Sequence, residues 1–413
     1  MPRWYSPRFA SRLAALALLG ALTACGPAMS PAPVIRPPPP YAPPPSAATA
    51  PKPPPQPNAT AVKVAVLLPL SGANADLGRA MIEAAQLALF TTGGDKLTLI
   101  PRDTTGTAQG AADAARAVIA DGAKLILGPL IADEAEAVKP IAAGANVNVI
   151  AFATKTQVAG GNVFLMGFLP RQEVAREVSY AREQGLSRFA ALAPNTPYGH
   201  LMGDALKEIA GSGGASVTKI EYFDPRAADT AASIKRLTAG ASAVSGGAPP
   251  GNGPPFDALL LPEGGDRLKQ IASQLRGAGV DPAQTHLLGS GLWDDASIAS
   301  EPALAGGWFA ASPPEARRDF EGRFKGAYGQ TPPRLASLAF DAAALASVLA
   351  KADSPDPFSQ AAIQNPNGFT GVDGLFRFGG DGLVQRGLAV IEVQPGGDKV
   401  VSPAPRSFAE AGF

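Results

Sequence analysis

The stretch VAVLLPLSGANADLGRAMIEAAQLAL, residues 64–89, decides the fold of this chain of 413 residues. It joins a run of β-branched and leucine residues, a polar loop with glycine, and an alanine-rich segment with helical spacing. In the last segment Leu77, Met81, Ala85 and Ala88 fall on one apolar face. The stretch therefore predicts a buried strand that leads through a loop into an amphipathic helix.

The same unit repeats along the rest of the chain, and the repeat starts again after residue 168. Such alternation predicts an α/β fold of two lobes, each a parallel sheet flanked by helices, with ligands bound beyond the carboxyl ends of the strands. The segment Gly240–Pro255 is predicted to be a flexible surface insertion. The predicted strands are Val62–Leu70, Leu97–Ile100, Lys124–Gly128, Val147–Phe152, Val163–Phe168, Arg188–Ala193, Ser216–Tyr222, Ala258–Leu261 and His286–Gly289.

The first residues differ in kind from the repeating region. Arg3, Arg8 and Arg12 precede an uncharged apolar run, Leu13–Ala24, which is too short to span a bilayer comfortably. Residues 1–24 are therefore predicted to be a signal peptide. Cys25, the single cysteine, follows in a sequence that resembles the lipobox of bacterial lipoproteins. We expect Cys25 to be lipidated and to anchor the protein without spanning the membrane; the alternative is a buried small hydrophobic residue.

Residues 25–60 are predicted to form a disordered, proline-rich stalk. Fifteen of the thirty-four residues from 27 to 60 are proline, and none is acidic. Such a segment favours polyproline II and, at about 3.1 Å per residue, reaches at most roughly 100 Å. We expect a passive spacer here in preference to a proline-motif ligand. Gly26, where the enterobacterial sorting rule places Asp for the inner membrane, is compatible with the outer membrane.

The net charge of zero hides an asymmetry between this leader region and the rest. Residues 1–60 hold five basic residues and no acid, which leaves thirty basic and thirty-five acidic residues in 61–413, a balance of −5. A mildly acidic globular part argues against nucleic acid as a partner. Its roughly 350 residues are ample for two lobes with separate cores.

No motif predicts an enzyme, a cofactor or a metal site. His200 and His286 are the only histidines, and neither belongs to His-Glu-x-x-His. A Gly-x-Ser-x-Gly elbow and a phosphate loop are both missing from the sequence. Gly379–Gly382 has too few ligands for a calcium loop and predicts a hairpin turn. The acids at 133, 134 and 136 are placed at a helix start, which Asp133 can cap.

Five sequence segments, in this order and spacing, resemble the leucine/isoleucine/valine-binding, type I periplasmic binding proteins. They are the opening stretch 64–89, LILGPL at 125–130, PNTPYG at 194–199, LAFDAAAL at 338–345 and GVDGLFRF at 371–378. The resemblance covers nearly all of 62–395. It implies a first lobe of 61–168 plus about 293–368, a second lobe of 169–292 plus about 369–398, and a C-terminal tail at 399–413.

Within this family, the lipobox, the stalk and the phrases VIAFAT, RFAALAP and LLGSGLWDD are similar to penicillin-binding protein activators. That resemblance implies an outer-membrane lipoprotein on the periplasmic side that docks on a peptidoglycan synthase. The alternative is the substrate-binding protein of an ABC transporter, which delivers an amino acid or amide to a permease. Ala132 stands where solute receptors carry a hydroxyl residue, which favours the activator.

The resemblance also implies a set of cleft residues. The loop Ser71–Gly72 precedes the first helix, whose free N–H groups could accept an α-carboxylate. Thr154 would supply a hydroxyl, Tyr198 would cover the ligand, and Glu263 and Asp294 would meet an α-ammonium, with Trp293 stacked beside it. The alternatives are a cap for Thr154, core packing for Tyr198, and solvated surface positions for the acids.

Overall fold

The structure is a computed structural model that describes residues 61–239, 255–282, 284–295, 297–298, 301–352 and 354–409. The predicted signal peptide, Cys25, the stalk and nearly all of the predicted insertion lie outside these residues. None of the helices in the described part is both long and apolar enough to cross a membrane.

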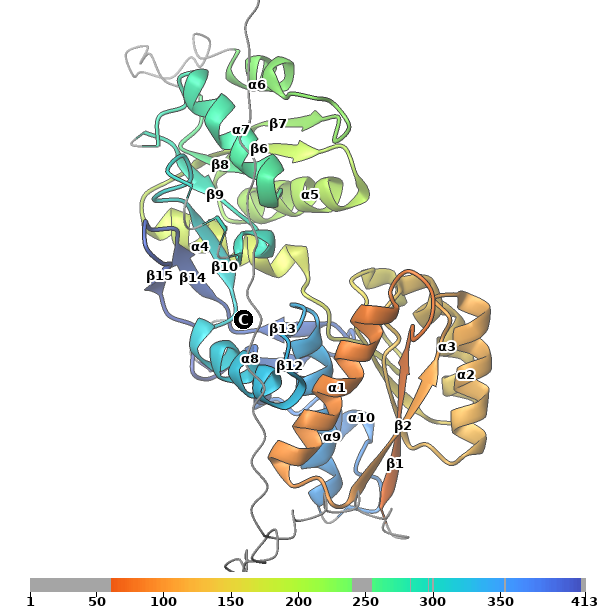
Figure 1. Cartoon of the computed structure of the whole chain (residues 1–413). Coiled ribbons are helices and arrows are strands. Elements are labelled where there is room, and N and C mark those ends of the chain that lie inside the picture. Colours follow the sequence, from red (N-terminus) through yellow and green to blue (C-terminus); the bar gives the residue numbers. More distant parts are fainter. Residues whose placement is uncertain are drawn as a thin grey trace, which may run out of the picture. The chain divides into compact units, whose positions relative to one another are not determined.

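The first sheet has five parallel strands in the order β2-β1-β3-β4-β5. Its strands are β1 Val62–Leu68, β2 Leu97–Asp103, β3 Leu125–Leu127, β4 Asn148–Ala151 and β5 Val163–Leu165; the helices between them are α1 Ala75–Thr92, α2 Ala108–Ala120 and α3 Ala132–Gly144, with the short turn η1 Thr156–Val158. Figure 1 shows β1 and β2 side by side. The strand and helix predicted from the opening stretch are β1 and α1, which confirms that prediction.

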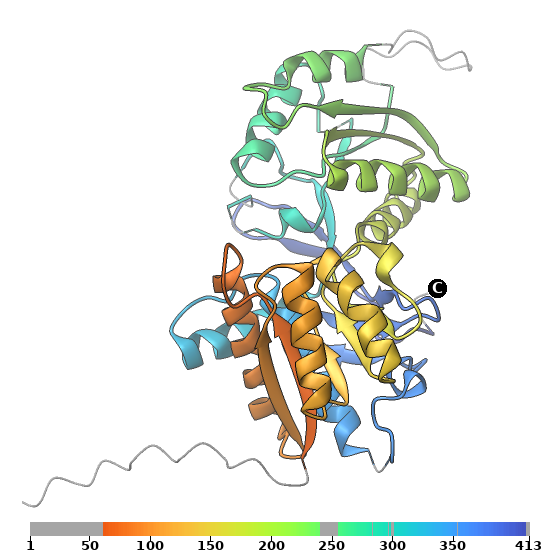
Figure 2. The same ribbon diagram turned by 90° about the vertical axis from the view of Figure 1, so that its right-hand side faces the viewer.

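Alternate residues of β1 enter two different hydrophobic cores, because successive side chains of a strand point to opposite faces. Val64 and Val66 pack in a core that contains Met81 of α1. Ala65 and Leu67 pack in a second core with Val138 of α3. Figure 2 shows the amber helices α2 and α3 in front of the orange strands. Both faces of the sheet are therefore covered, as parallel sheets require.

The second sheet has seven strands in the order β15-β14-β10-β9-β8-β6-β7. The first five along the chain pair in parallel, and β14 and β15 add an antiparallel edge. Helices α4 and α5 pack on one face and α6 and α7 on the other. The elements are α4 Pro170–Glu183, β6 Arg188–Pro194, α5 Pro197–Ser212, β7 Ser216–Phe223, α6 Ala231–Thr238, β8 Ala258–Leu260, α7 Gly265–Gly277, β9 His286–Leu288, η2 Gly291–Trp293, β10 Trp308–Ala311, β14 Ala389–Glu392 and β15 Lys399–Ser402.

The remaining elements return to the first half. Phe320, Phe340 and Phe376 share the core of α1, and α9 lies along α1 in Figure 1. The remaining elements are α8 Pro314–Tyr328, α9 Ala336–Lys351, α10 Gln360–Ile363 and a small antiparallel sheet of β11 Phe369–Gly371, β12 Gly374–Phe378 and β13 Val384–Arg386. The turn between β12 and β13 contains Gly379–Gly382, which confirms the predicted hairpin.

Three boundaries therefore differ from those that the resemblance implied. The chain leaves the second half after β10 and not near Trp293, because Trp308 pairs in parallel with Leu288 of β9. It returns only after β13 and not near Gly368. The predicted tail begins with β15, which pairs with β14. The N-cap of α3 also differs from the predicted Asp133. It is Ile131, whose N–H donates a hydrogen bond to the carboxylate of Glu134 at 3.5 Å.

A buried carboxylate holds the β11–β12 turn to α9. Asp341 is 1% exposed, and its two oxygens accept hydrogen bonds from the backbone N–H groups of Val372 at 2.7 Å and Asp373 at 3.1 Å. Burial, together with the neighbouring Asp373, raises the pKa of Asp341 to about 7. The turn therefore depends on this side chain for two backbone bonds.

We expect Asp341→Ala to lower the free energy of unfolding by about 2–4 kcal/mol, because two buried N–H groups lose their acceptor. Urea denaturation followed by circular dichroism measures the change. Asp113→Ala is the matched control, since that side chain is 61% exposed and its i,i+3 pair with Arg116 is worth less than about 1 kcal/mol. Equal effects of the two substitutions would contradict this role of Asp341.

Candidate functional site

A cavity of about 530 Å³ lies where elements of both halves meet. The loop after β4 contributes Phe152 and Thr154, and the segment before α4 contributes Phe168. Tyr198 of α5 and Leu292 of η2 line it from the second half. Most of its wall is apolar, with a few polar side chains among the lining residues, which is the usual composition of a small-molecule site.

The structure brings three of the predicted site residues to this cavity. Thr154, Tyr198 and Asp294 are among its lining residues. Tyr198 bonds Ser290 through its hydroxyl, and burial raises its pKa, with further contributions from Glu173 and other acids nearby. Asp294 is not free, because its carboxylate forms ion pairs with Arg317 and with Arg334.

The Ser71–Gly72 loop and Glu263 are absent from the lining of the cavity. The Ser71–Gly72 loop is held by Asp103, which accepts hydrogen bonds from Ser71 and, at 2.8 Å, from the N–H of Leu70. Burial acts against ionisation of Asp103, but these bonds outweigh it and lower its pKa. Glu263 accepts a bond from the N–H of Gly264 at 3.1 Å.

Trp293 occupies the core and not the cavity. Its side chain is 0% exposed, and its indole N–H donates to the carbonyl of Leu261 at 3.2 Å. The ring lies over Gly289 and Gly307, where any Cβ would clash with it. A fully buried indole has no face left for a ligand, so the prediction that Trp293 stacks on one is wrong.

Glu173, which the sequence analysis did not single out, also lines the cavity. It is 8% exposed, and its Oε2 accepts the N–H of Gly291 at 2.9 Å. Burial raises its pKa to about 7, against the effects of the Gly291 bond and of Arg334. Glu177, one turn later, accepts the N–H of Ala310 at 2.9 Å, and burial raises its pKa well above the usual range.

The signal for these acids was present in the sequence. Glu173 and Glu177 stand four residues apart, beside Val174 and Val178, in the segment that forms α4. That spacing places the acids and the valines on one side of the helix. An acid pair on an apolar helix face is unusual, because buried carboxylates need partners. What the sequence could not supply was the identity of those partners.

Arginines gather on one wall of the cavity around Phe168. The Arg334 guanidinium lies 4.2 Å from the ring centroid and the Arg386 guanidinium 4.9 Å. Arg334 also forms an ion pair with Asp373 at 2.9 Å and one with Asp294 at 3.5 Å. None of these arginines was predicted as a site residue.

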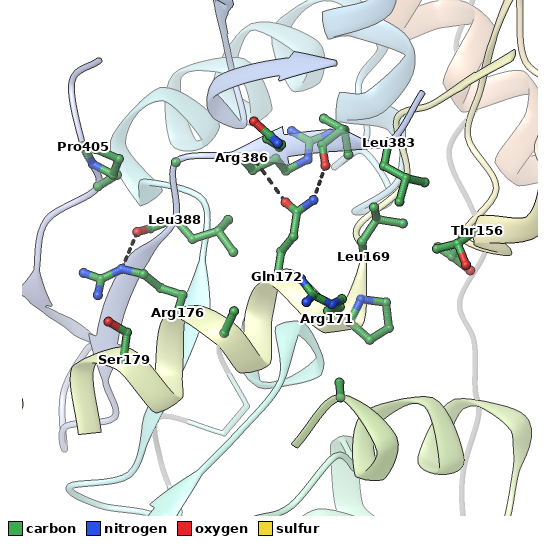
Figure 3. Close-up of a pocket in the computed structure, with 18 of the residues that line it drawn as sticks. Thr156, Leu169, Arg171, Gln172, Arg176, Ser179, Leu383, Arg386, Leu388 and Pro405 are labelled. Atoms are coloured by element: carbon green, nitrogen blue, oxygen red, sulfur yellow. Dashed lines mark hydrogen bonds between the residues drawn. The ribbon is translucent and has the colours of Figure 1, made fainter. Parts of the chain in front are cut away.

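A second, larger cavity of about 1050 Å³ runs along α4, between α5 and residues 402–406 (Figure 3). Gln172 donates to the carbonyl of Val384 and accepts the N–H of Arg386 at 3.0 Å. Arg176 donates to the carbonyl of Leu388 at 2.9 Å. These side chains tie α4 to β13 and to the connection that follows it. We take the smaller cavity as the candidate site, because three of the predicted site residues line it.

Comparisons with known proteins find the same fold. The family model described as periplasmic binding protein matches residues 61–398. A putative branched-chain amino acid ABC transporter protein from Rhodospirillum rubrum is similar at 19% identity, with a TM-score of 0.72, over 83% of this chain and 100% of that one. LivJ from Streptococcus pneumoniae, solved with isoleucine, is 19% identical with a TM-score of 0.58, over 83% and 100%. A solute-binding protein from R. palustris, solved with benzoate, is 20% identical with a TM-score of 0.58, over 84% and 98%. No curated protein matches the chain.

We expect Glu173→Gln to stabilise the protein increasingly as the pH rises. A carboxyl whose pKa is about 7 in the folded state and about 4.5 when unfolded costs nothing below pH 4.5. Its ionisation destabilises the fold between pH 4.5 and 7, by on the order of 3 kcal/mol in total. Glutamine keeps an oxygen for the Gly291 N–H and removes this cost.

The measurement is urea denaturation of both proteins at pH 4.5, 6 and 7.5. Glu183→Gln, an exposed change on the same helix, is the matched control and should track the native protein at every pH. A constant difference between Glu173→Gln and the native protein across this range would contradict the buried, ionisable role of Glu173.

Proposed function

Because the chain belongs to the periplasmic binding protein family, we propose that it is a non-enzymatic, ligand-binding protein of the bacterial periplasm that delivers a small molecule to an ABC permease. The observation that carries this proposal is the cavity between the halves. Its volume of about 530 Å³ fits a small solute, and its wall includes Thr154 and Tyr198. Its ligand class includes amino acids, amides and small organic acids, since similar solved proteins hold isoleucine and benzoate.

Closure on a ligand fits the way the chain connects the halves. The chain passes between the two sheets three times, after β5, β10 and β13. Hinged closure of lobes is a common response of such proteins to a ligand. In this proposal Tyr198 and Leu292 meet the ligand from the second half, and Thr154 and Phe168 meet it from the first.

The lipid anchor belongs to the same proposal. Cys25 carries the lipid, and residues 25–60 act as a spacer between the membrane and the binding domain. The spacer allows a reach of at most roughly 100 Å. The anchor holds the domain on the periplasmic side, and the sorting residue Gly26 is compatible with the outer membrane.

One set of observations favours a second function, activation of a peptidoglycan synthase. Three features of an amino-acid receptor are missing or engaged. Ala132 has no hydroxyl, Asp294 is held by two arginines, and Glu263 bonds its own loop. With the proline-rich stretch, these suit a docking protein that needs no amino-acid ligand. Its partner would be a penicillin-binding protein.

A thermal-shift screen of the full chain against amino acids, amides and small carboxylates tests the first function. We expect at least one class to raise the unfolding temperature, because a ligand at a hundredfold excess over its Kd adds about 2.7 kcal/mol of stability. Thr154→Val should weaken the response, since the hydroxyl contact is lost. Thr107→Val, a helix cap remote from the cavity, is the control.

No shift with any compound would overturn the transport function. In that event the activator predicts a concrete result: the chain should capture a bifunctional peptidoglycan synthase and raise its rate in vitro. Failure of both experiments would remove both functions.

A further inference from the structure

One carboxylate oxygen on the wall of the candidate cavity is free and accessible. Glu173 lines this cavity and not the larger one. Its Oε2 accepts the N–H of Gly291 at 2.9 Å, whereas its Oε1 accepts no hydrogen bond in the described part of the chain. The residue is 8% exposed, and Oε1 keeps accessible surface, unlike Oε2 of Glu177, which has neither a partner nor exposure. A free polar atom that opens into a cavity is a place where a ligand can bond.

Gly291 leaves this oxygen uncovered. It lines the same cavity, and a Cβ at its position would lie 2.9 Å from Oε1 of Glu173. That distance is shorter than ordinary contact, so any side chain at 291 would cover or displace the carboxylate. The backbone of η2 therefore binds one oxygen of Glu173 and, because it has no side chain at this point, leaves the other open to the cavity.

The charges beside the cavity are balanced within the protein. Three guanidinium groups face three carboxylates: Arg317, Arg334 and Arg386 face Asp294, Asp373 and Glu321. Arg318 and Asp398 also lie close to Arg317; both are exposed, and their charges are opposite in sign. On the cavity wall, Lys155 is paired with Glu136 at 2.6 Å. A charged ligand would therefore leave an unbalanced charge in a partly buried place, which is costly.

Two further buried acids lie in this region, and they differ in access. Burial raises the pKa of Asp341 and of Glu173 to about 7, so both carboxyl groups exist with and without a proton at neutral pH. Asp341 does not line the cavity, and its oxygens accept two backbone N–H groups. Glu173 does line it, and its Oε1 can donate when protonated and accept when ionised. An amide or a hydroxyl pairs with either form, because each of these groups both donates and accepts.

An ammonium group suits this position less well. It pairs only with the ionised carboxylate. The cations on the wall are also more accessible than the acids: the side chains of Arg334 and Lys155 are 30% and 46% exposed, whereas Asp294 is 10% exposed and is held by two arginines. The charge of Arg334 acts on Glu173, so an ammonium bonded to Oε1 would be repelled by that guanidinium.

The rest of the wall suits a hydrocarbon group. Phe152, Leu292 and Leu335 are among its apolar residues. Leu292 is 47% exposed, which is unusual for a large hydrophobic side chain in this protein. Covering such a surface is favourable, because apolar area leaves contact with water.

We propose that the cavity binds an uncharged small molecule with an apolar body and one amide or hydroxyl group, and that Oε1 of Glu173 bonds this group. The apolar body lies against Phe152, Leu292 and Leu335. This inference rests on the proposed ligand-binding function and narrows its ligand class to uncharged molecules.

Two sets of probes test the inference by isothermal titration calorimetry on the purified full chain at pH 7. Benzamide, benzoate and benzamidinium share a planar shape and are neutral, anionic and cationic. 4-Methylpentan-1-ol, 4-methylpentanoate and 4-methylpentylammonium form the same series on a branched aliphatic skeleton. We expect benzamide or 4-methylpentan-1-ol to bind about tenfold or more tighter than either charged member of its set, because an unbalanced charge is costly to bury.

Two substitutions locate the hydrogen bond. Gly291→Ala should weaken binding of the neutral probe about tenfold or more, because the added methyl group covers Oε1. Glu173→Gln keeps an acceptor for the Gly291 N–H but turns an amide NH2 group toward the ligand, and should weaken binding about threefold or more. The unfolding temperature of each ligand-free variant shows whether it is folded.

Each substitution has a matched control. Gly322→Ala lies on α8, where an added Cβ meets nothing within 4 Å. Glu183→Gln is an exposed change on the same helix as Glu173. Neither position lines the candidate cavity, so both controls should leave binding unchanged.

The outcomes separate this inference from the function it rests on. Tighter binding of a charged probe than of the neutral member of its set would overturn the uncharged class, while small-molecule binding stands. Binding of a neutral probe that Gly291→Ala and Glu173→Gln both leave unchanged would overturn the role of Glu173. If no probe binds although the thermal-shift screen finds a ligand, the inference alone is wrong; if that screen finds none either, the transport function is wrong as well.

Discussion

The guanidinium of Arg386 is the constraint on which the arrangement of the two halves depends. A buried charge is costly unless neighbouring groups compensate it. Here the carbonyl of Met166 accepts a hydrogen bond, the ring of Phe168 stacks on the cation, and Asp373 supplies opposite charge. Met166 and Phe168 belong to the connection between β5 and α4, Asp373 belongs to the β11–β12 turn, and Arg386 itself ends β13, just before the third connection. The arginine keeps its compensation only while all of these segments stay in place.

The fold was largely predictable because its strands and helices carry their own periodicity. β1 and α1 need no partner to be recognised, since burial on both faces gives β1 a continuous apolar run. The later boundaries depend on pairing between distant segments. β10 is only four residues long, and its place beside β9 rests on long-range contacts. Nothing local distinguishes such a strand from one of the first half, so the second and third crossings were misplaced.

The candidate site was predictable only where a loop follows a strand. Thr154 follows β4 and Tyr198 stands in the first turn of α5, so both lie at carboxyl ends of strands, where ligands bind, and the family resemblance singled them out there. The strand-end rule does not point to Arg334 or Arg386, because Arg334 stands just before a helix and Arg386 ends a strand of the small antiparallel sheet. Trp293 also lies after a strand, but the prediction that it contacts a ligand is wrong, because Gly289 and Gly307 leave room for its ring inside the core. A loop position predicts proximity to a site but not the direction of a side chain.

The same residues serve the connections and the cavity, and this links binding to stability. Arg386 and Glu173 line the cavity, and each also holds a crossing segment or the η2 turn through a hydrogen bond to backbone. The charges around them are balanced within the protein, because Arg317, Arg334 and Arg386 face the carboxylates of Asp294, Asp373 and Glu321. A substitution at Arg386 or Glu173 therefore changes the wall of the cavity and, at the same time, a hydrogen bond that holds a connecting segment.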